Sequence, residues 1–330
     1  MKEIRIAYLG VERPSAQQLE AILCLEKSKY YINETHVNPD YLLVPISHLW
    51  HDINVWNEFK RLYSNDRIVI FWGDEAIIPD LNLFDYAISY DDSVIAGDRV
   101  IHYPNSSRWP GIESLIKGNM LTTSEAKELY RKRAFCNFIY SNPYSNMKRD
   151  ELFKCLNVYK KADSLGKHLN NCPMTDTNLE DGWFERSVAM KSNYRFSISS
   201  ENSSVSGYTS EKIVSALIAH SIPIYWGNEN IGMDFNEDAF INATNMNEDE
   251  LLELVKIIDN DEKTWCEMVT RPWRLDWQVE NARKNYRKYR DFCNNFFSQD
   301  VTDAKRVPQG TWVWEFQRAF LDREELSLHH

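Results

Sequence analysis

Short apolar runs separated by amphipathic stretches make up the first part of the chain. Apolar residues alternate from Ile4 to Tyr8 and predict an opening strand, and residues 15–28 predict a helix. The continuous apolar runs RIVIFWG (67–73) and FDYAISY (84–90) are typical of parallel strands that are buried on both faces. Strands that alternate with helical segments predict an α/β sheet.

The same pattern begins again after a turn-rich stretch. A basic start, an apolar strand and an Asn-Pro stop occupy residues 131–143, and a helical pattern follows. Further on, the pattern predicts a strand, a polar loop, a helix and another strand, at residues 193–200, 201–210, 211–220 and 221–227. This order is a βαβ unit.

Chain length favours two domains, because 330 residues exceed the usual ~100–200 residues of one domain. We place the boundary near residue 130, which gives an N-terminal domain of residues 1–130 and a C-terminal domain of residues 131–330. The amphipathic stretch 279–297 predicts a terminal helix that docks on the body and leaves a basic face in solvent. The less favoured interpretation of this stretch is peripheral contact with a membrane surface.

Charge and cysteine content narrow the class of protein. The formal net charge of −11 argues against general nucleic-acid binding, which requires a broad positive field. The six cysteines are scattered and form no CxxC pair, so we expect free thiols in a reducing compartment. Without a secretory leader or a run of ~20 apolar residues, the expected location is the cytoplasm, with a peripheral position at the inner membrane surface as the alternative.

The polar stretch ENSSVSGYTSEK (201–212) lies between a predicted strand and a predicted helix, where ligands bind in βα units. Its simplest interpretation is structural: Thr209 or Ser210 caps the helix, and Glu211 complements the helix dipole. Lys212 does not fit this interpretation, because a cation opposes the dipole at a helix start. Lys212 and the free helix N–H groups together suit a phosphate, and Glu211 suits sugar hydroxyls. The local chemistry therefore leaves capping and an anionic sugar or nucleotide as equal hypotheses.

Other candidate chemistry is weak. The chain contains neither GxGxxG nor GxxxxGK[ST], so neither a Rossmann dehydrogenase nor a P-loop NTPase is indicated. Asp91 and Asp92 follow a predicted strand, and such a pair in a turn is usually solvated. His48 and His51 have the spacing of ligands on one helix face, but no third ligand is visible nearby. We therefore expect no metal site.

The stretch around the loop carries a family resemblance. Residues 194–242, YRFSISSENSSVSGYTSEKIVSALIAHSIPIYWGNENIGMDFNEDAFIN, resemble the signature of the α1,3/α1,4-fucosyltransferases, motif by motif and in order. FCNFIYSNP (135–143) and NLFDYAISY (82–90) are similar to further family motifs. The resemblance extends over residues 65–270, and the two ends of the chain carry little of it.

The resemblance implies a GT-B architecture, in which two Rossmann-like domains face each other across a cleft. The C-terminal domain is then expected to hold the donor GDP-fucose, and the N-terminal domain to receive the acceptor. The implied reaction is inverting transfer of fucose to the GlcNAc of a β-galactosyl-GlcNAc glycan, of the N-acetyllactosamine or lactose type, which yields Lewis-type structures. No metal or other cofactor is implied.

The resemblance also implies roles for individual residues. Glu75 lies where the family has its catalytic base, with the adjacent Asp74 as the alternative. Arg149 is near the place of the phosphate arginine, but one extra residue separates it from Pro143, so Lys148 is an alternative. The remaining expected donor contacts are Lys212 on the diphosphate, Glu211 on ribose or fucose hydroxyls, and Asn202 and Tyr208 on the nucleotide side.

Two residues depart from the family pattern. Ser210 replaces a Thr and keeps the capping hydroxyl, whereas Ser200 replaces a Phe and changes the packing beneath the loop. The second departure bears on fucose as the donor sugar more than on the guanine nucleotide. The alternative functions are a GT-B transferase with another nucleotide sugar and a non-catalytic sugar-binding protein.

Overall fold

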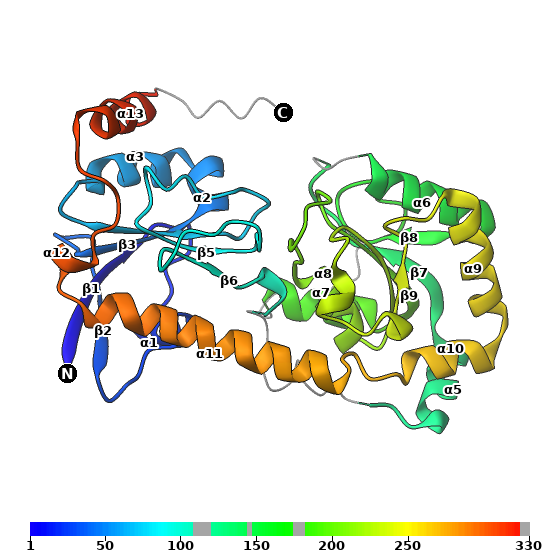
Figure 1. Cartoon of the computed structure of the whole chain (residues 1–330). Coiled ribbons are helices and arrows are strands. Elements are labelled where there is room, and N and C mark those ends of the chain that lie inside the picture. Colours follow the sequence, from blue (N-terminus) through cyan, green and yellow to red (C-terminus); the bar gives the residue numbers. More distant parts are fainter. Residues whose placement is uncertain (108–119, 144–146, 174–181, 324–330) are drawn as a thin grey trace. The chain divides into compact units, whose positions relative to one another are not determined.

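The structure is a computed structural model that describes residues 1–107, 120–143, 147–173 and 182–323. The chain folds as two compact units (Figure 1). The first unit contains residues 1–104 and 284–330, and the second contains residues 105–283. Each unit is built on its own parallel β-sheet, which confirms the predicted α/β class.

The first unit contains a six-stranded sheet in the order β2-β1-β3-β4-β5-β6, and all neighbouring strands are parallel. The strand order reverses between β1 and β3, so the sheet is doubly wound. Its strands are β1 (Lys2–Tyr8), β2 (Tyr30–Glu34), β3 (Tyr41–Pro45), β4 (Ile68–Trp72), β5 (Tyr86–Ser89) and β6 (Val100–His102).

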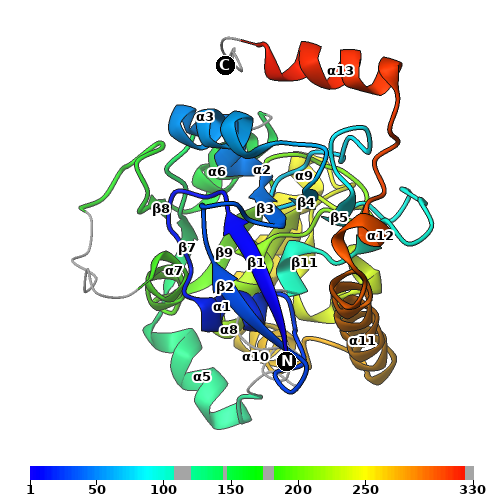
Figure 2. The same ribbon diagram turned by 90° about the vertical axis from the view of Figure 1, so that its left-hand side faces the viewer.

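Helices cover both faces of this sheet (Figure 2). One face buries Ile6 and Leu43 against α1 and against Phe296 of α11. The other face buries Val44 against Phe59 of α3. The helices of this unit are α1 (Ala16–Ile22), α2 (Ile46–His51), α3 (Ile53–Leu62), most of α11 (Asp276–Ser298), α12 (Val301–Ala304) and α13 (Thr311–Leu321).

The second unit contains a five-stranded parallel sheet in the order β11-β10-β9-β7-β8. Its strands are β7 (Ala134–Phe138), β8 (Ala162–Ser164), β9 (Tyr194–Ser200), β10 (Ile222–Trp226) and β11 (Ile241–Asn242). The strand β9, the helix α8 and the strand β10 form the βαβ unit that the sequence predicts.

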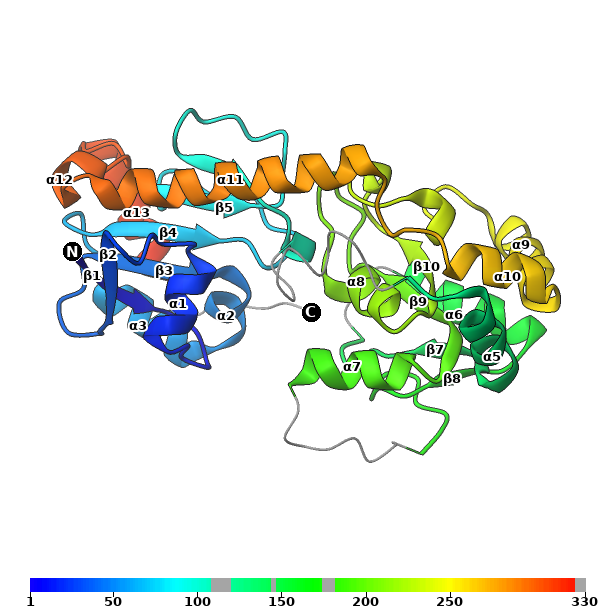
Figure 3. The ribbon, with the colours of Figure 1, turned by 90° about the horizontal axis from the view of Figure 1, so that it is seen from below.

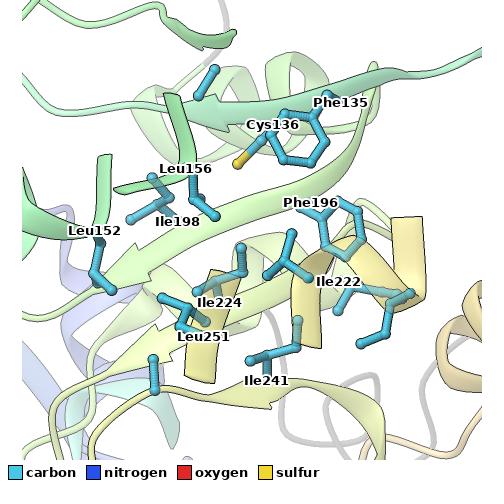
Figure 4. Close-up of a cluster of buried hydrophobic side chains, with 14 of the residues drawn as sticks. Phe135, Cys136, Leu152, Leu156, Phe196, Ile198, Ile222, Ile224, Ile241 and Leu251 are labelled. Carbon is cyan, nitrogen blue, oxygen red and sulfur yellow. The ribbon is translucent and has the colours of Figure 1, made fainter. Parts of the chain in front are cut away.

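Two helical layers cover the second sheet as well. On one face, strand residues such as Phe196 and Ile224 pack on Leu156 of α6 and Leu251 of α9 (Figure 4). On the other face, α7 and α8 bury Phe184, Ile213 and Leu217. The helices of this unit are α5 (Thr123–Lys132), α6 (Lys148–Tyr159), α7 (Trp183–Lys191), α8 (Glu211–Ile218), α9 (Glu248–Asn260) and α10 (Glu262–Val269). Its described residues also form three short 3-10 turns, η1 (Asn105–Ser107), η2 (Ile231–Met233) and η3 (Glu237–Ala239).

The division into units differs from the predicted boundary near residue 130 in two ways. Helix α5 belongs to the second unit, because Tyr130 packs against Trp265 with the two rings tilted by 52°, and it donates a hydrogen bond to the carbonyl oxygen of Asp259 at 2.7 Å. The C-terminal residues 284–330 belong to the first unit, because the apolar face of α11 completes its core. The predicted assignment of this tail to the C-terminal domain is therefore wrong.

Helix α11 is one continuous helix of 23 residues (Figure 3). Its apolar residues Tyr289, Cys293, Phe296 and Phe297 are buried, which confirms the docked helix that the amphipathic pattern predicts. All six cysteines are free thiols, as predicted. Among the described residues, no helix is both long and apolar enough to span a membrane.

Candidate functional site

The order of the second sheet marks one place for a ligand. Strand β7 lies between β8 and β9. The chain runs from β7 to β8 on one side and then crosses to the other side of β7 to form β9. In doubly wound sheets, ligands bind at the carboxyl ends of strands at this point of reversal. Tyr140 and Asn142 follow β7, and the loop 201–210 follows β9, so both lie at this edge.

The loop 201–210 is held in place by the residues after β10. Asn228 is buried; its Oδ1 accepts from the Gly207 N–H at 3.0 Å, and its Nδ2 donates to Thr209 Oγ1 at 3.1 Å. Ser204 Oγ donates to the carbonyl oxygen of Gly227 at 2.7 Å. Gly207 has a φ of 77°, a conformation that favours glycine. The polar loop is therefore a fixed part of the site.

Glu201 is a fully buried carboxylate at the start of this loop. It accepts hydrogen bonds from the backbone N–H and the hydroxyl of Ser210, at 2.8 and 2.6 Å. Burial raises the pKa of Glu201, and the nearby ammonium of Lys212 opposes this increase. A Cβ at Gly227 would lie 2.5 Å from Glu201 Cγ, so the close approach of the two strand ends requires glycine. Sequence reasoning gave Glu201 no role, although its place directly after a buried strand is a usable signal.

The first turn of α8 presents Lys212 and Glu211. Lys212 Nζ donates to Ser210 Oγ at 2.9 Å and lies 3.4 Å from carboxylate oxygens of both Glu201 and Glu211. Burial alone lowers the pKa of Lys212, but the carboxylates of Glu211 and Glu201 outweigh it, and the net pKa is raised. Lys212 is therefore a cation at any physiological pH. The helix N-cap is Ser210, whereas Thr209 bonds to Asn228, which decides between the two predicted caps.

Arg149 lies in the first turn of α6 and is only 4% exposed. Its guanidinium lies 4.1 Å over the ring of Tyr140 and donates to the carbonyl oxygen of Asn142 at 3.4 Å. Its Nε is buried without a hydrogen-bond partner, and no carboxylate of the described residues lies within ion-pair distance. Lys148, the predicted alternative, is more exposed and pairs with Glu151 at 3.6 Å. Among the described residues, Arg149 is therefore a buried cation without a counter-charge.

Tyr140 joins the two strand ends beneath this cation. Its hydroxyl accepts from the backbone N–H of Ser200 at 2.8 Å and lies 3.0 Å from the carbonyl oxygen of Ile198. Burial raises the pKa of Tyr140 to about 12, so the phenol stays neutral. Ser200, the departure from the family pattern, is fully buried beneath the loop, where the sequence places it. Tyr208 is also buried, and Asn202 is half-buried in the same loop.

The predicted base and its alternative lie in the first unit, after β4. Asp74 accepts hydrogen bonds from the backbone N–H and the hydroxyl of Ser47, at 2.9 and 2.5 Å. Its carboxylate therefore fixes the start of α2. Glu75 is half-buried and follows Asp74 directly. The structure thus gives Asp74 a structural role at the start of α2.

The weaker metal candidates have ordinary contacts. Asp91 accepts from the N–H and hydroxyl of Ser93 at 2.8 and 2.6 Å, which is a turn interaction, and Asp92 is exposed. His48 Nδ1 accepts from the backbone N–H of Val11 at 3.2 Å. Within the part of the chain that the structure describes, no group of three or more His, Cys, Asp or Glu could hold a metal ion.

Comparison with known proteins agrees with this geometry. Residues 129–309 match the model of glycosyltransferase family 10 (fucosyltransferase), C-terminal part. The alpha-(1,3)-fucosyltransferase of Helicobacter pylori is 27% identical over 237 residues, which cover 63% of this chain and 47% of that protein. The GDP-fucose protein O-fucosyltransferase 3 of Xenopus tropicalis is 23% identical over 248 residues, 72% of this chain and 47% of that protein. The chain thus spans about half the length of these relatives.

The fold is similar to that of a solved alpha1,3-fucosyltransferase. The TM-score is 0.65 at 19% identity, and the match covers 93% of each chain. This likeness and the two doubly wound sheets confirm the predicted GT-B class of two Rossmann-like domains. Because the family model matches more than half of the chain, through the strands and helices that carry the candidate site, the chain belongs to glycosyltransferase family 10, the fucosyltransferases.

Proposed function

We propose that the chain transfers L-fucose from GDP-β-L-fucose to the GlcNAc of a β-galactosyl-GlcNAc glycan, with an α1,3 or α1,4 linkage. The observation that carries the proposal is a pair of cations at the reversal point of the second sheet: Arg149 after β7, which is buried without a carboxylate partner among the described residues, and the half-buried Lys212 after β9. A buried cation without a counter-charge is costly unless a ligand supplies one. A diphosphate supplies two negative charges at the place where this fold binds ligands.

The proposed reaction is a single displacement. The acceptor oxygen forms a bond to the anomeric carbon of fucose while the bond from that carbon to the β-phosphate oxygen breaks. GDP leaves with the bonding electron pair, and the configuration at the anomeric carbon inverts. Arg149 can fork two phosphate oxygens, and Lys212 adds a second charge, so both stabilise the negative charge that develops on GDP.

Glu75 is the proposed general base that takes the proton of the acceptor hydroxyl. The contacts of Asp74 support this choice, because both of its carboxylate oxygens already accept from Ser47. A carboxylate whose two oxygens both accept hydrogen bonds at a helix start is a poor proton acceptor.

The remaining polar residues of the site orient the donor. Glu211 is proposed to accept hydrogen bonds from ribose or fucose hydroxyls, while Asn202 and Tyr208 contact the nucleotide side. Glu201 acts beneath them, because it holds Ser210 and Lys212 in place from a buried position. The donor class is also supported by a solved alpha1,3-fucosyltransferase with GDP-fucose, which has a similar fold at a TM-score of 0.60.

No metal takes part in the proposed reaction, since two protein cations neutralise the diphosphate. Turnover measured with excess EDTA is expected to equal turnover without it. Loss of activity with EDTA, restored by one divalent cation, would contradict this part of the proposal.

A donor-by-acceptor panel tests the proposed function. The full chain is incubated with GDP-fucose, GDP-mannose or UDP-glucose, and with N-acetyllactosamine, lactose or a peptide acceptor. We expect GDP release only from GDP-fucose, faster with a disaccharide, and an α-linked fucose on GlcNAc by linkage analysis. Transfer to the peptide alone would favour the protein-modifying activity named for the Xenopus relative. Release from another donor would favour a different transferase, and binding without release would favour a sugar-binding protein.

A further inference from the structure

A lysine is buried beneath the candidate donor site and has no part in the proposed reaction. Lys191, the last residue of α7, is 4% exposed. Among the residues that the structure describes, no carboxylate lies within ion-pair distance of its ammonium. A lysine is rarely buried in this way without a partner, so its contacts call for an explanation.

The ammonium of Lys191 contacts the backbone and a side chain at the start of α8. Its Nζ donates to the carbonyl oxygen of Lys212 at 3.2 Å and to the hydroxyl of Ser215. The hydroxyls of Ser215 and Ser199 also donate to this carbonyl, at 3.1 and 3.2 Å. Three donors therefore converge on the backbone of the residue whose side chain is the proposed diphosphate ligand.

We propose that Lys191 is a positioning residue of the donor site, an inference that rests on the proposed function. Its ammonium fixes the first turn of α8, so that Lys212 and Glu211 are aimed at the donor before it binds. Its charge also adds to the positive potential that attracts the diphosphate. Lys191 touches no part of the donor in this proposal and acts through α8.

The charge of Lys191 is sensitive to pH near neutrality. Burial lowers the pKa of Lys191 to about 7, the carboxylates of Glu211 and Glu201 oppose this decrease, and the ammonium of Lys212 adds to it. In the described part of the chain, the charged groups that face Lys191 are these three, from α8 and from the end of β9. Below pH 7 the ammonium is charged and favours an anionic ligand, and above it this attraction is lost. Donor affinity is therefore expected to fall as the pH rises through about 7.

The same coupling predicts proton uptake. A bound diphosphate raises the pKa of a nearby ammonium, so Lys191 takes up a proton when the donor binds at a pH just above 7. GDP-fucose is the suitable probe, because its diphosphate is esterified at both ends and has no group that titrates near neutrality. Free GDP is unsuitable, since its terminal phosphate titrates in this range.

The test measures the dissociation constant of GDP-fucose by calorimetry for the full chain, near pH 6 and near pH 8.5. The variants are Lys191→Met, which removes the charge, and Ser215→Ala, which keeps it. Lys132→Met is the matched control, because Lys132 also ends a helix of the second unit but is exposed and pairs with Glu128. We expect Lys191→Met to weaken binding about tenfold near pH 6, as for a lost charge-assisted hydrogen bond, and to remove the pH dependence.

Further readouts separate positioning from a general loss of structure. Turnover at saturating GDP-fucose is expected to stay within about twofold for Lys191→Met, because only the affinity depends on α8 being prearranged. Ser215→Ala is expected to keep the pH dependence, and Lys132→Met to match the wild type. If Lys191→Met does not fold, proton uptake by the wild type, measured in buffers of different ionisation enthalpy, decides the question.

Three results would overturn the inference. Wild-type pH dependence that persists in Lys191→Met assigns the titration elsewhere, for example to Glu201, whose pKa is raised. Binding by the wild type without proton uptake near pH 7.5 excludes a coupled lysine. A wild-type chain that does not bind GDP-fucose at any pH contradicts the proposed function itself, and the role of Lys191 with it. The first two results leave the proposed function untouched.

Discussion

At the scale of single residues, the cations of the site differ in whether a carboxylate lies beside them. Lys212 is charged between two carboxylates, whereas Arg149 is charged over an aromatic ring without any. Arg195 is a largely buried arginine of the same unit, with a side chain 13% exposed, and it pairs with the fully buried Asp259 at 2.9 Å. An unpaired buried charge destabilises a fold, whereas a paired one does not. Substitution of Arg149 and of Arg195 is therefore expected to change the free energy of unfolding differently.

Arg149→Met is expected to leave the free energy of unfolding unchanged or slightly higher, because it removes an uncompensated buried charge. The same variant is expected to weaken GDP-fucose binding at least tenfold, a loss of at least about 1.4 kcal/mol. Arg195→Met is the matched control: it leaves Asp259 with Lys160 alone and lowers stability by roughly 1–3 kcal/mol, with donor affinity kept. Thermal unfolding with and without GDP-fucose measures both quantities, and a strongly destabilised Arg149→Met would show that this arginine is structural.

The neighbouring carboxylates after β4 are distinguished by a second pair of variants. Glu75→Gln is expected to lower kcat by about 10²–10⁴-fold with donor affinity kept, because it removes only the proton acceptor. Asp74→Asn weakens the two hydrogen bonds from Ser47, and its expected effect is a loss of about 1–2 kcal/mol of stability with a smaller loss of kcat. If Asp74→Asn lost the larger share of kcat, the roles of the two residues would be exchanged.

At the scale of elements, hydrophobic periodicity predicted the strands and helices that frame the site. The runs at 193–200, 211–220 and 221–227 correspond to β9, α8 and β10. The shortest strands, β6, β8 and β11, were not predicted, because three or two residues carry no periodicity. The helix predicted over 15–28 ends at Ile22, just before Cys24 adopts a positive φ of 50°. The pattern of apolar and polar residues does not predict a change of backbone conformation such as the one at Cys24.

The contact between β10 and the loop after β9 gives a prediction at this scale. Gly227→Ala would place a Cβ 2.5 Å from Glu201 Cγ and 2.8 Å from the hydroxyl of Tyr225, so the two strand ends must separate. We expect a loss of about 1–3 kcal/mol of stability and weaker donor binding, since Glu201 holds Lys212. Gly310→Ala is the control, because nothing lies within 4 Å of its Cβ. Equal behaviour of the two variants in thermal unfolding and GDP-fucose binding would contradict this account.

At the scale of the whole molecule, the sequence did not predict which residues and faces become buried against which sheet. The basic and apolar faces of α11 were predicted, but not the unit that receives them, because an amphipathic helix fits any apolar sheet face. Glu201 and Lys191 were missed as parts of the site for the same reason. Their types are usually exposed, and only the packing of α7 and α8 on β9 buries them. The family motif supplied most of the proposed donor-binding residues, since those from Asn202 to Lys212 lie in one short stretch of the chain.

The division of the chain predicts separate responses of the two units to core mutations. Phe296 of α11 is fully buried in the first unit, and Phe196 of β9 is fully buried in the second. Each Phe→Ala change is expected to cost about 3–5 kcal/mol, because it leaves a cavity. Phe296→Ala is expected to lower the thermal stability of the first unit while GDP-fucose still stabilises the second. Phe196→Ala, in the strand that leads to the donor loop, is expected to reduce stabilisation by GDP-fucose. Hydrogen exchange resolved by segment measures each unit, and loss of protection in the second unit alone on Phe296→Ala would refute the assignment of α11.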